Sequence, residues 1–235
     1  MKVFRDPRGL EALLLDAGNT IVFLDMTAVA AVALEEGVTV APARLLAVEG
    51  EAKRRYEAKL GEGGSHEAGW RLYLETLLTA AGVEEVAARA LIDPLRAAHD
   101  RLNLWRRVPA DLPDALERAR RLGLRIGVVS NSEGKLPELF AHVGLGDAFE
   151  LVVDSAHEGI RKPDPRIFHR ATERMGVAPA AALYAGDIPS VDVHGAHGAG
   201  LDAALVDPHD FYPNHAASPR FASVAELVTA LERAR

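Results

Sequence analysis

The chain has 235 residues and a formal net charge of −7, with 34 acidic residues against 27 lysines and arginines. This balance argues against a general nucleic-acid binder, and the absence of cysteine excludes disulfides, thiolate nucleophiles and cysteine-ligated zinc. No apolar run approaches the roughly 20 residues of a transmembrane helix, and residues 1–9 lack the apolar core of a secretory signal. We therefore expect a cytoplasmic enzyme without a membrane or nucleic-acid partner.

The first predicted strand is a short apolar run that ends on a carboxylate. Residues 13–15 are three leucines typical of a fully buried strand, and residues 17–19 supply the sharp turn that ends it. Asp16 is thereby placed at the carboxyl edge of a sheet, where open α/β folds bind their ligands. Residues 20–25 are expected to form a small hairpin beside this turn.

Residues 26–104 differ in composition from the rest of the chain, being rich in Ala, Leu, Glu and Arg. Three stretches carry apolar side chains at helical spacing, namely residues 42–60, 67–81 and 84–102. A glycine-rich break at residues 61–65 separates the first two. The segment is predicted to be a helical lobe inserted after the first strand, so that residues 1–25 and 105–235 form the other domain.

Short apolar runs alternate with helical patterns in the second half of the chain. The predicted strands are residues 124–130, 151–154, 182–185 and 202–206. The predicted helices are residues 112–122, 135–143, 163–175 and 223–234. Strands that alternate with helices form a parallel sheet covered on both faces. The predicted fold class is therefore α/β.

Polar side chains follow the predicted strands. They are Asp16 after the first strand, Ser130 and Asn131 after the second, Lys162 in the turn after the third, and Asp187 and Asp192 after the fourth. Because parallel strands end at the same edge of a sheet, we expect these residues to gather there. The predicted site thus combines carboxylates with a lysine, a hydroxyl and backbone amides.

This combination indicates phosphoryl transfer. Clustered carboxylates repel one another unless a cation lies among them, and oxygen ligands without cysteine favour Mg²⁺. Ser130, the backbone of Asn131 and Lys162 are suitable donors to phosphate oxygens. A carboxylate nucleophile, a Mg²⁺ site and a phosphate cradle together describe transfer through an aspartyl-phosphate.

Four segments resemble, in order, the sequence marks of the haloacid dehalogenase-like (HAD) hydrolase superfamily. They are residues 16–20 (DAGNT), 128–131 (VVSN), 162–168 (KPDPRIF) and 186–192 (GDIPSVD). The resemblance spans essentially the whole chain. It implies a Rossmann-like core, and residues 26–104 are identified as an α-helical cap that closes over the site.

The resemblance also implies a role for each matching position. Asp16 is the implied nucleophile, and Lys162 neutralises charge between this nucleophile and the phosphate. The implied metal ligands are Asp16, the Gly18 carbonyl, Asp187 and Asp192, the last directly or through water. The residues implied to hold the phosphate are Ser130, Asn131 and Lys162.

Gly18 departs from the family pattern. Most phosphatases of the family have a second aspartate at this position, where it protonates the leaving group and later activates water. General acid–base help is worth about 10²–10⁴-fold, so its loss should be felt most with poor leaving groups. The cap, Glu133 or the substrate itself are the possible sources of the acid.

Other reactions of the superfamily remain open. Dehalogenases attack carbon without a metal, whereas Asp187 and Asp192 indicate a metal site. Phosphonate-cleaving relatives use a cap lysine as a Schiff base, and both cap lysines, Lys53 and Lys59, are expected to face water. A phospholigand-binding member without turnover is a further alternative. The leading prediction is a Mg²⁺-dependent phosphatase of a small phosphorylated metabolite, as a monomer or homodimer.

Overall fold

The computed structural model describes residues 4–61 and 66–235, and the chain divides into two compact units. The first unit comprises Met1–Phe23 and Trp105–Arg235, and we call it the sheet unit. The second comprises Leu24–Leu104, and we call it the helical unit. The predicted glycine-rich break at residues 61–65 lies largely outside the described residues.

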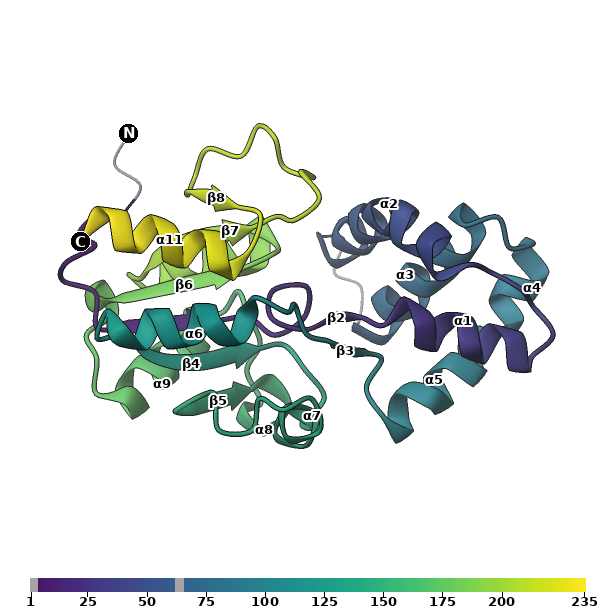
Figure 1. The fold of residues 1–235 in the computed structure, drawn as a ribbon, viewed down its shortest axis with the longest axis horizontal. Coiled ribbons are helices and arrows are strands. Elements are labelled where there is room, and N and C mark those ends of the chain that lie inside the picture. Colours follow the sequence, from purple (N-terminus) through teal and green to yellow (C-terminus); the bar gives the residue numbers. More distant parts are fainter. Residues whose placement is uncertain (1–3, 62–65) are drawn as a thin grey trace. The chain divides into compact units, whose positions relative to one another are not determined.

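The sheet unit is built on a six-stranded parallel sheet with the order β5-β4-β1-β6-β7-β8 (Figure 1). Its strands are β1 (Ala12–Leu15), β4 (Arg125–Ser130), β5 (Leu151–Asp154), β6 (Ala182–Gly186), β7 (Asp202–Val206) and β8 (Arg220–Phe221). Leu15 at the end of β1 pairs with Val128 of β4 and Ala185 of β6. The carboxyl ends of these three strands therefore lie side by side, and the predicted α/β class with a Rossmann-like parallel sheet is confirmed.

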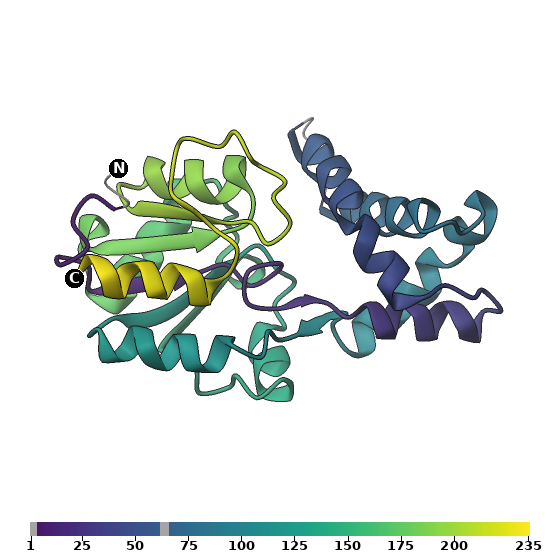
Figure 2. The same cartoon turned by 45° about the horizontal axis from the view of Figure 1, so that its top comes forward.

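Helices cover both faces of this sheet (Figures 1 and 2). One face carries α6 (Leu112–Arg121), α7 (Leu136–His142) and α11 (Val224–Ala234), and the other carries α9 (Pro165–Met175) and α10 (His194–Gly198). Successive strand residues point to opposite faces, so Leu13 and Leu15 enter the first core while Leu14 enters the second. All three leucines are fully buried, which explains the unbroken apolar run.

The start and end of α9 follow from its sequence. The Asp164 carboxylate accepts the Arg166 amide at 3.0 Å, and Pro165 occupies the first turn, where its missing N–H costs nothing. Gly176 ends the helix in the left-handed conformation, with φ at 62°. The helix begins two residues later than predicted because Asp164 caps it. Its position brings Lys162, just upstream, to the carboxyl edge of the sheet.

The described part of the helical unit holds five helices where the sequence predicted three. They are α1 (Met26–Glu35), α2 (Pro42–Gly61), α3 (His66–Ala80), α4 (Glu85–Ala90) and α5 (Ile92–Arg101). The first is capped by the Asp25 carboxylate, which accepts the Thr27 and Ala28 amides at 3.0 and 3.1 Å. The predicted helix at 84–102 is two helices that meet at Leu91. None of the described helices is long and apolar enough to cross a bilayer.

Two expectations about strands are wrong. The hairpin expected over residues 20–25 does not form, since β2 (Phe23–Leu24) pairs instead with β3 (Trp105–Arg107). The strand over Asp202–Val206 is also not the last, because β8 follows it as a short parallel edge strand. Both pairings join segments far apart in sequence, and local patterns do not reveal them.

Candidate active site

Asp16 follows the central strand β1 and lies at the carboxyl edge of the sheet. Its amide donates to the Ala185 carbonyl at 2.8 Å, so the ladder to β6 continues one residue past the strand. The chain then turns through Asn19, which adopts a positive φ of 54°. The Asn19 Oδ1 accepts the indole N–H of Trp105 at 3.2 Å, which holds this turn in place. The Asp16 side chain is 10% exposed.

The Lys162 ammonium binds the Asp16 carboxylate directly. Its Nζ lies 2.6 Å from Asp16 Oδ1, 2.7 Å from Asp192 Oδ1 and 2.6 Å from the Tyr184 hydroxyl. These three acceptors match the three N–H donors of an ammonium. Burial alone would lower the pKa of Lys162, but the Asp16 and Asp192 carboxylates outweigh burial and raise it. The lysine is therefore a permanent cation between two carboxylates.

Asp192 organises the loop that follows β6. Its Oδ2 accepts the backbone amides of Asp187 and Ile188 at 2.9 and 2.8 Å, while its Oδ1 faces Lys162 and Tyr184. Both oxygens are thus engaged within the protein, and Asp192 is 1% exposed. These contacts fix the backbone of Asp187 and Ile188.

Three carboxylates of the site could hold a cation. Asp16, Asp187 and Asp192 each offer an oxygen, and these oxygens lie within 4.8 Å of one another; no other such group occurs in the described residues. The pKa of Asp16 is raised to about 7: burial is the main cause, Lys162 opposes it, and the Asp192 and Asp187 carboxylates add to it. Buried oxygen donors with an excess of negative charge over one lysine fit a hard divalent cation.

The structure places the predicted phosphate-binding residues beside this cluster in different ways. Ser130 ends β4, next to β1, and is buried, but its hydroxyl makes no hydrogen bond to Asp16 or Lys162 within the described residues. The Asn131 side chain instead binds the main chain of Lys162, donating to its carbonyl at 3.0 Å and accepting its amide at 2.8 Å. Asn131 therefore supports the lysine, and the role predicted for its backbone stays a prediction.

Two residues of the site were not predicted from the sequence. Tyr184 lies in β6 with its hydroxyl on Lys162. Asp154, at the end of β5, accepts bonds from the Ser132 hydroxyl and the Gly134 amide, and so ties down the loop after β4. The sequence does hold a sign of the role of Tyr184: it lies inside an apolar strand, and a buried phenol needs a hydrogen-bond partner.

The expectation that Lys53 faces water is wrong. Lys53 is 4% exposed and lies on α2, with Glu49 one helical turn before it. Glu49 is itself buried and accepts the Tyr73 hydroxyl of α3 at 2.9 Å. Charged residues occur all along α2, so the sequence does not reveal which of them face the neighbouring helix. Lys59 is half-buried.

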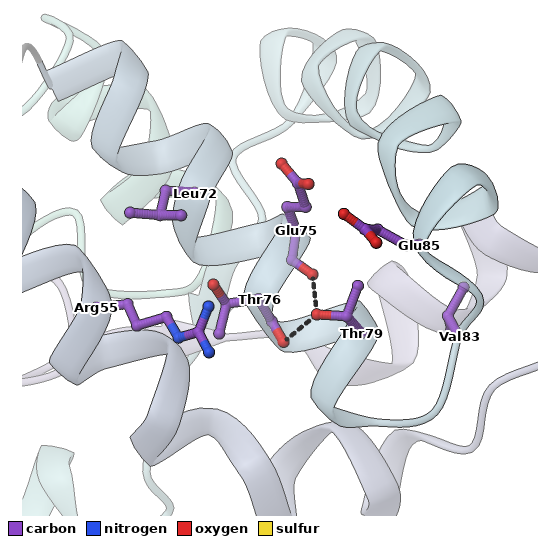
Figure 3. Close-up of a pocket in the computed structure, with 7 residues that line it drawn as sticks. All are labelled: Arg55, Leu72, Glu75, Thr76, Thr79, Val83 and Glu85. Carbon is purple, nitrogen blue, oxygen red and sulfur yellow. Dashed lines mark hydrogen bonds between the residues drawn. The ribbon is translucent and has the colours of Figure 1, made fainter.

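A separate pocket of about 330 Å³ lies within the helical unit (Figure 3). It is lined by Arg55, Leu72, Glu75, Thr76, Thr79, Val83 and Glu85. Its charged groups pair with protein partners, since Arg89 binds both Glu75 and Glu85 while Arg55 binds Glu51. The Thr79 hydroxyl donates to backbone carbonyls of its own helix. Because its charged side chains are already paired within the protein, the pocket does not indicate which ligand it would bind.

The parallel sheet thus carries a buried aspartate–lysine–aspartate cluster at the carboxyl end of its central strands. The profile of the haloacid dehalogenase-like hydrolases matches residues 10–200. The chain belongs to this family of hydrolases.

Several curated relatives carry the same domain. The chain is 38% identical over 138 residues to the phosphoserine phosphatase of Thermus thermophilus, covering 58% of this chain and 53% of the relative. It is 33% identical over 148 residues to haloacid dehalogenase-like hydrolase domain-containing protein 3 of Bos taurus, covering 63% and 59%. It is 30% identical over 157 residues to the glyceraldehyde 3-phosphate phosphatase of Methanopyrus kandleri, covering 65% and 64%. The matches thus span between about half and two thirds of these relatives.

Solved structures share the fold over nearly the whole chain. The HAD-hydrolase YfnB from Bacillus subtilis, bound to magnesium, superposes with a TM-score of 0.71 at 21% identity, covering 94% of this chain and 98% of that one. The L-2-haloacid dehalogenase of Xanthobacter autotrophicus superposes with a TM-score of 0.61 at 20% identity, covering 95% and 98%. At these identities the likeness establishes the fold alone.

Proposed function

We propose that this hydrolase is a Mg²⁺-dependent phosphatase that cleaves a small phosphorylated metabolite through an aspartyl-phosphate on Asp16. The observation that carries the proposal is the buried contact of Asp16 with Lys162, next to Asp187. Two of the relatives above are named phosphatases. Residues 26–104, as an inserted cap, would select the substrate.

The carboxylate cluster supports a proposed set of metal ligands. Asp16 and Asp187, with the Gly18 carbonyl, would hold Mg²⁺. Asp192 would take part indirectly, since its oxygens already bind Lys162, Tyr184 and two backbone amides. When bound, Mg²⁺ offsets the negative charge that the phosphoryl oxygens bring to the carboxylates.

Asp16 is the proposed nucleophile. Its carboxylate attacks phosphorus, and the electron pair of the breaking P–O bond leaves with the alcohol or acyl oxygen. Water then cleaves the aspartyl-phosphate, which releases phosphate and restores the carboxylate. Lys162 orients Asp16 through its 2.6 Å contact and stabilises the negative charge between nucleophile and phosphoryl group.

The proton for the leaving group has no evident source in the Lys162 cluster. The ammonium donates to three acceptors, and the Tyr184 hydroxyl donates to the Val129 carbonyl at 2.8 Å. Burial raises the pKa of Tyr184 well above its ordinary value, so this phenol is a poor acid. With Gly18 lacking a side chain, we propose substrates whose leaving group departs without a proton, such as acyl phosphates.

The test is hydrolysis of p-nitrophenyl phosphate and acetyl phosphate with MgCl₂ and with EDTA. We expect Mg²⁺-dependent turnover in the wild type and in Asp147→Asn, a matched control at an exposed aspartate. Asp16→Asn should lose at least about 10³-fold, because the covalent step then has no nucleophile. Turnover that survives in Asp16→Asn contradicts the proposal. A silent wild type would favour the carbon–halogen, phosphonate or binding alternatives.

A further inference from the structure

The Tyr184 side chain reaches beneath the central strand of the sheet. Its ring is fully buried and packs edge-on against Phe168 of α9, with the ring centroids 4.9 Å apart at 85°. Its hydroxyl donates to the Val129 carbonyl of β4 at 2.8 Å. Because β1 lies between β4 and β6, this single side chain ties together the two strands that flank Asp16.

The direction of the hydroxyl proton makes Tyr184 an acceptor for the lysine. A phenol carries one O–H donor, and the Val129 carbonyl is closer at 2.8 Å than the Asp192 carboxylate at 3.2 Å. The oxygen therefore presents its lone pairs to the Lys162 ammonium, 2.6 Å away. Tyr184 is thus the neutral member among the three acceptors of this ammonium.

We propose that Tyr184 is a positioning residue that sets the orientation of the Lys162 ammonium. The inference rests on the proposed function, in which Lys162 acts on Asp16 and on the phosphoryl group. With one N–H held by Tyr184 and one by Asp192, the third N–H is directed at Asp16 Oδ1. The phenol adds a third, neutral acceptor to the two carboxylates and so helps to fix the rotation of the ammonium about its Cε–Nζ bond.

Removing the hydroxyl leaves one N–H of a buried ammonium without its acceptor. Unpaired buried donors are costly, so the ammonium should turn toward its two carboxylates and change its contact with Asp16. The substrate still meets the same residues, so KM should change little. We expect kcat to fall on the order of 10- to 100-fold, the range typical of residues that orient a catalytic group.

The experiment compares Tyr184→Phe with Thr172→Val. Each variant removes one buried hydroxyl of the sheet unit that donates to a backbone carbonyl, and Thr172 donates to the His169 carbonyl at 3.0 Å. Both should lower the unfolding midpoint in urea similarly. The first readout is kcat and KM on p-nitrophenyl phosphate with MgCl₂, where the control should match the wild type.

The second readout does not depend on activity. The chain has five lysines, and an ammonium held by three buried acceptors should give a slowly exchanging ¹H–¹⁵N signal, assigned by its loss in Lys162→Met. We expect Tyr184→Phe to shift or broaden this signal and Thr172→Val to leave it unchanged.

The outcomes separate the inference from the proposed function. A lower kcat at constant KM, together with a changed Lys162 signal, supports the inference. An unchanged signal in Tyr184→Phe, or an unchanged kcat, overturns it. If the wild type hydrolyses neither test compound, the proposed function fails, and the NMR signal alone still decides whether Tyr184 orients Lys162.

Discussion

Asn131 holds the main chain of Lys162 by a closed pair of hydrogen bonds. Its Nδ2 donates to the Lys162 carbonyl at 3.0 Å, and its Oδ1 accepts the Lys162 amide at 2.8 Å. The ammonium at the other end of the side chain is held by Asp16, Asp192 and Tyr184. Lys162 is therefore fixed at both ends, which is the arrangement a preorganised catalytic group requires.

Asn131→Asp should damage this support without changing the size of the side chain. A carboxylate oxygen would replace the Nδ2 donor and face the Lys162 carbonyl, so one hydrogen bond becomes a repulsive contact. We expect kcat on p-nitrophenyl phosphate to fall about 10-fold or more. Asn214→Asp makes the same change at an exposed asparagine and should be neutral. Equal rates in the two variants would show that the clamp on Lys162 does not matter for catalysis.

Gly18→Asp should add a proton donor two residues after the proposed nucleophile. Among the described residues, a Cβ at this position would have only the Trp105 Cδ1 within 4 Å, at 3.9 Å, so the backbone accepts a Cβ here. We expect rates on alkyl phosphates, whose leaving groups need a proton, to rise by up to about 10²-fold, with little change on acetyl phosphate.

The measurement is the dependence of kcat/KM on leaving-group pKa across a series of phosphate esters. Gly18→Asn is the matched control, since it has the same size without an acidic proton. The wild-type dependence should be steep and that of Gly18→Asp shallow. A wild-type dependence that is already shallow would mean that another residue supplies the proton, and the substrate class proposed above would be withdrawn.

Thr20→Val should stabilise the protein. Thr20 is 2% exposed, and its hydroxyl has no hydrogen-bond partner among the described residues. An unpaired buried hydroxyl costs about 1–3 kcal/mol, so the isosteric valine should raise the free energy of unfolding in urea by about 1 kcal/mol. Thr172→Val is the control, because that buried hydroxyl donates to the His169 carbonyl at 3.0 Å and its loss should destabilise. Equal destabilisation of both variants would count against an unpaired Thr20.

The strand ends could be predicted because they depend on local patterns. The leucine run before Asp16 and the apolar run before Asp187 each end where small turn residues begin. The alternation with helices then requires parallel strands, so the approach of these two carboxylates followed from topology alone. The structure places both in one cluster with Lys162.

The contacts between side chains from different elements could not be predicted in this way. The Asn131 side chain binds a main chain 31 residues away, and the Tyr184 hydroxyl crosses β1 to reach Val129. Whether Lys53 faces water or is buried depends on how α2 packs, and the sequence around Lys53 is charged throughout. Such contacts are set by strand order and helix orientation, which a single sequence does not specify.

Glu158 should make stability depend on acid pH. Its 8% exposed carboxylate binds Arg170 and Arg174, each at 2.6 Å. The hydrogen bond from Arg174 is the main cause that lowers the pKa of Glu158 below 4.5; burial opposes it and Arg170 adds to it. A carboxylate with a lowered pKa stabilises the folded state at pH values above its pKa in the unfolded chain. This stabilisation is lost as the pH falls through its pKa in the folded state. Glu158→Gln should therefore cost about 1 kcal/mol at pH 7 in urea unfolding, with the difference fading below about pH 4. Exposed Glu173→Gln should show neither effect, and a pH-independent cost for Glu158→Gln would contradict the ion pairs.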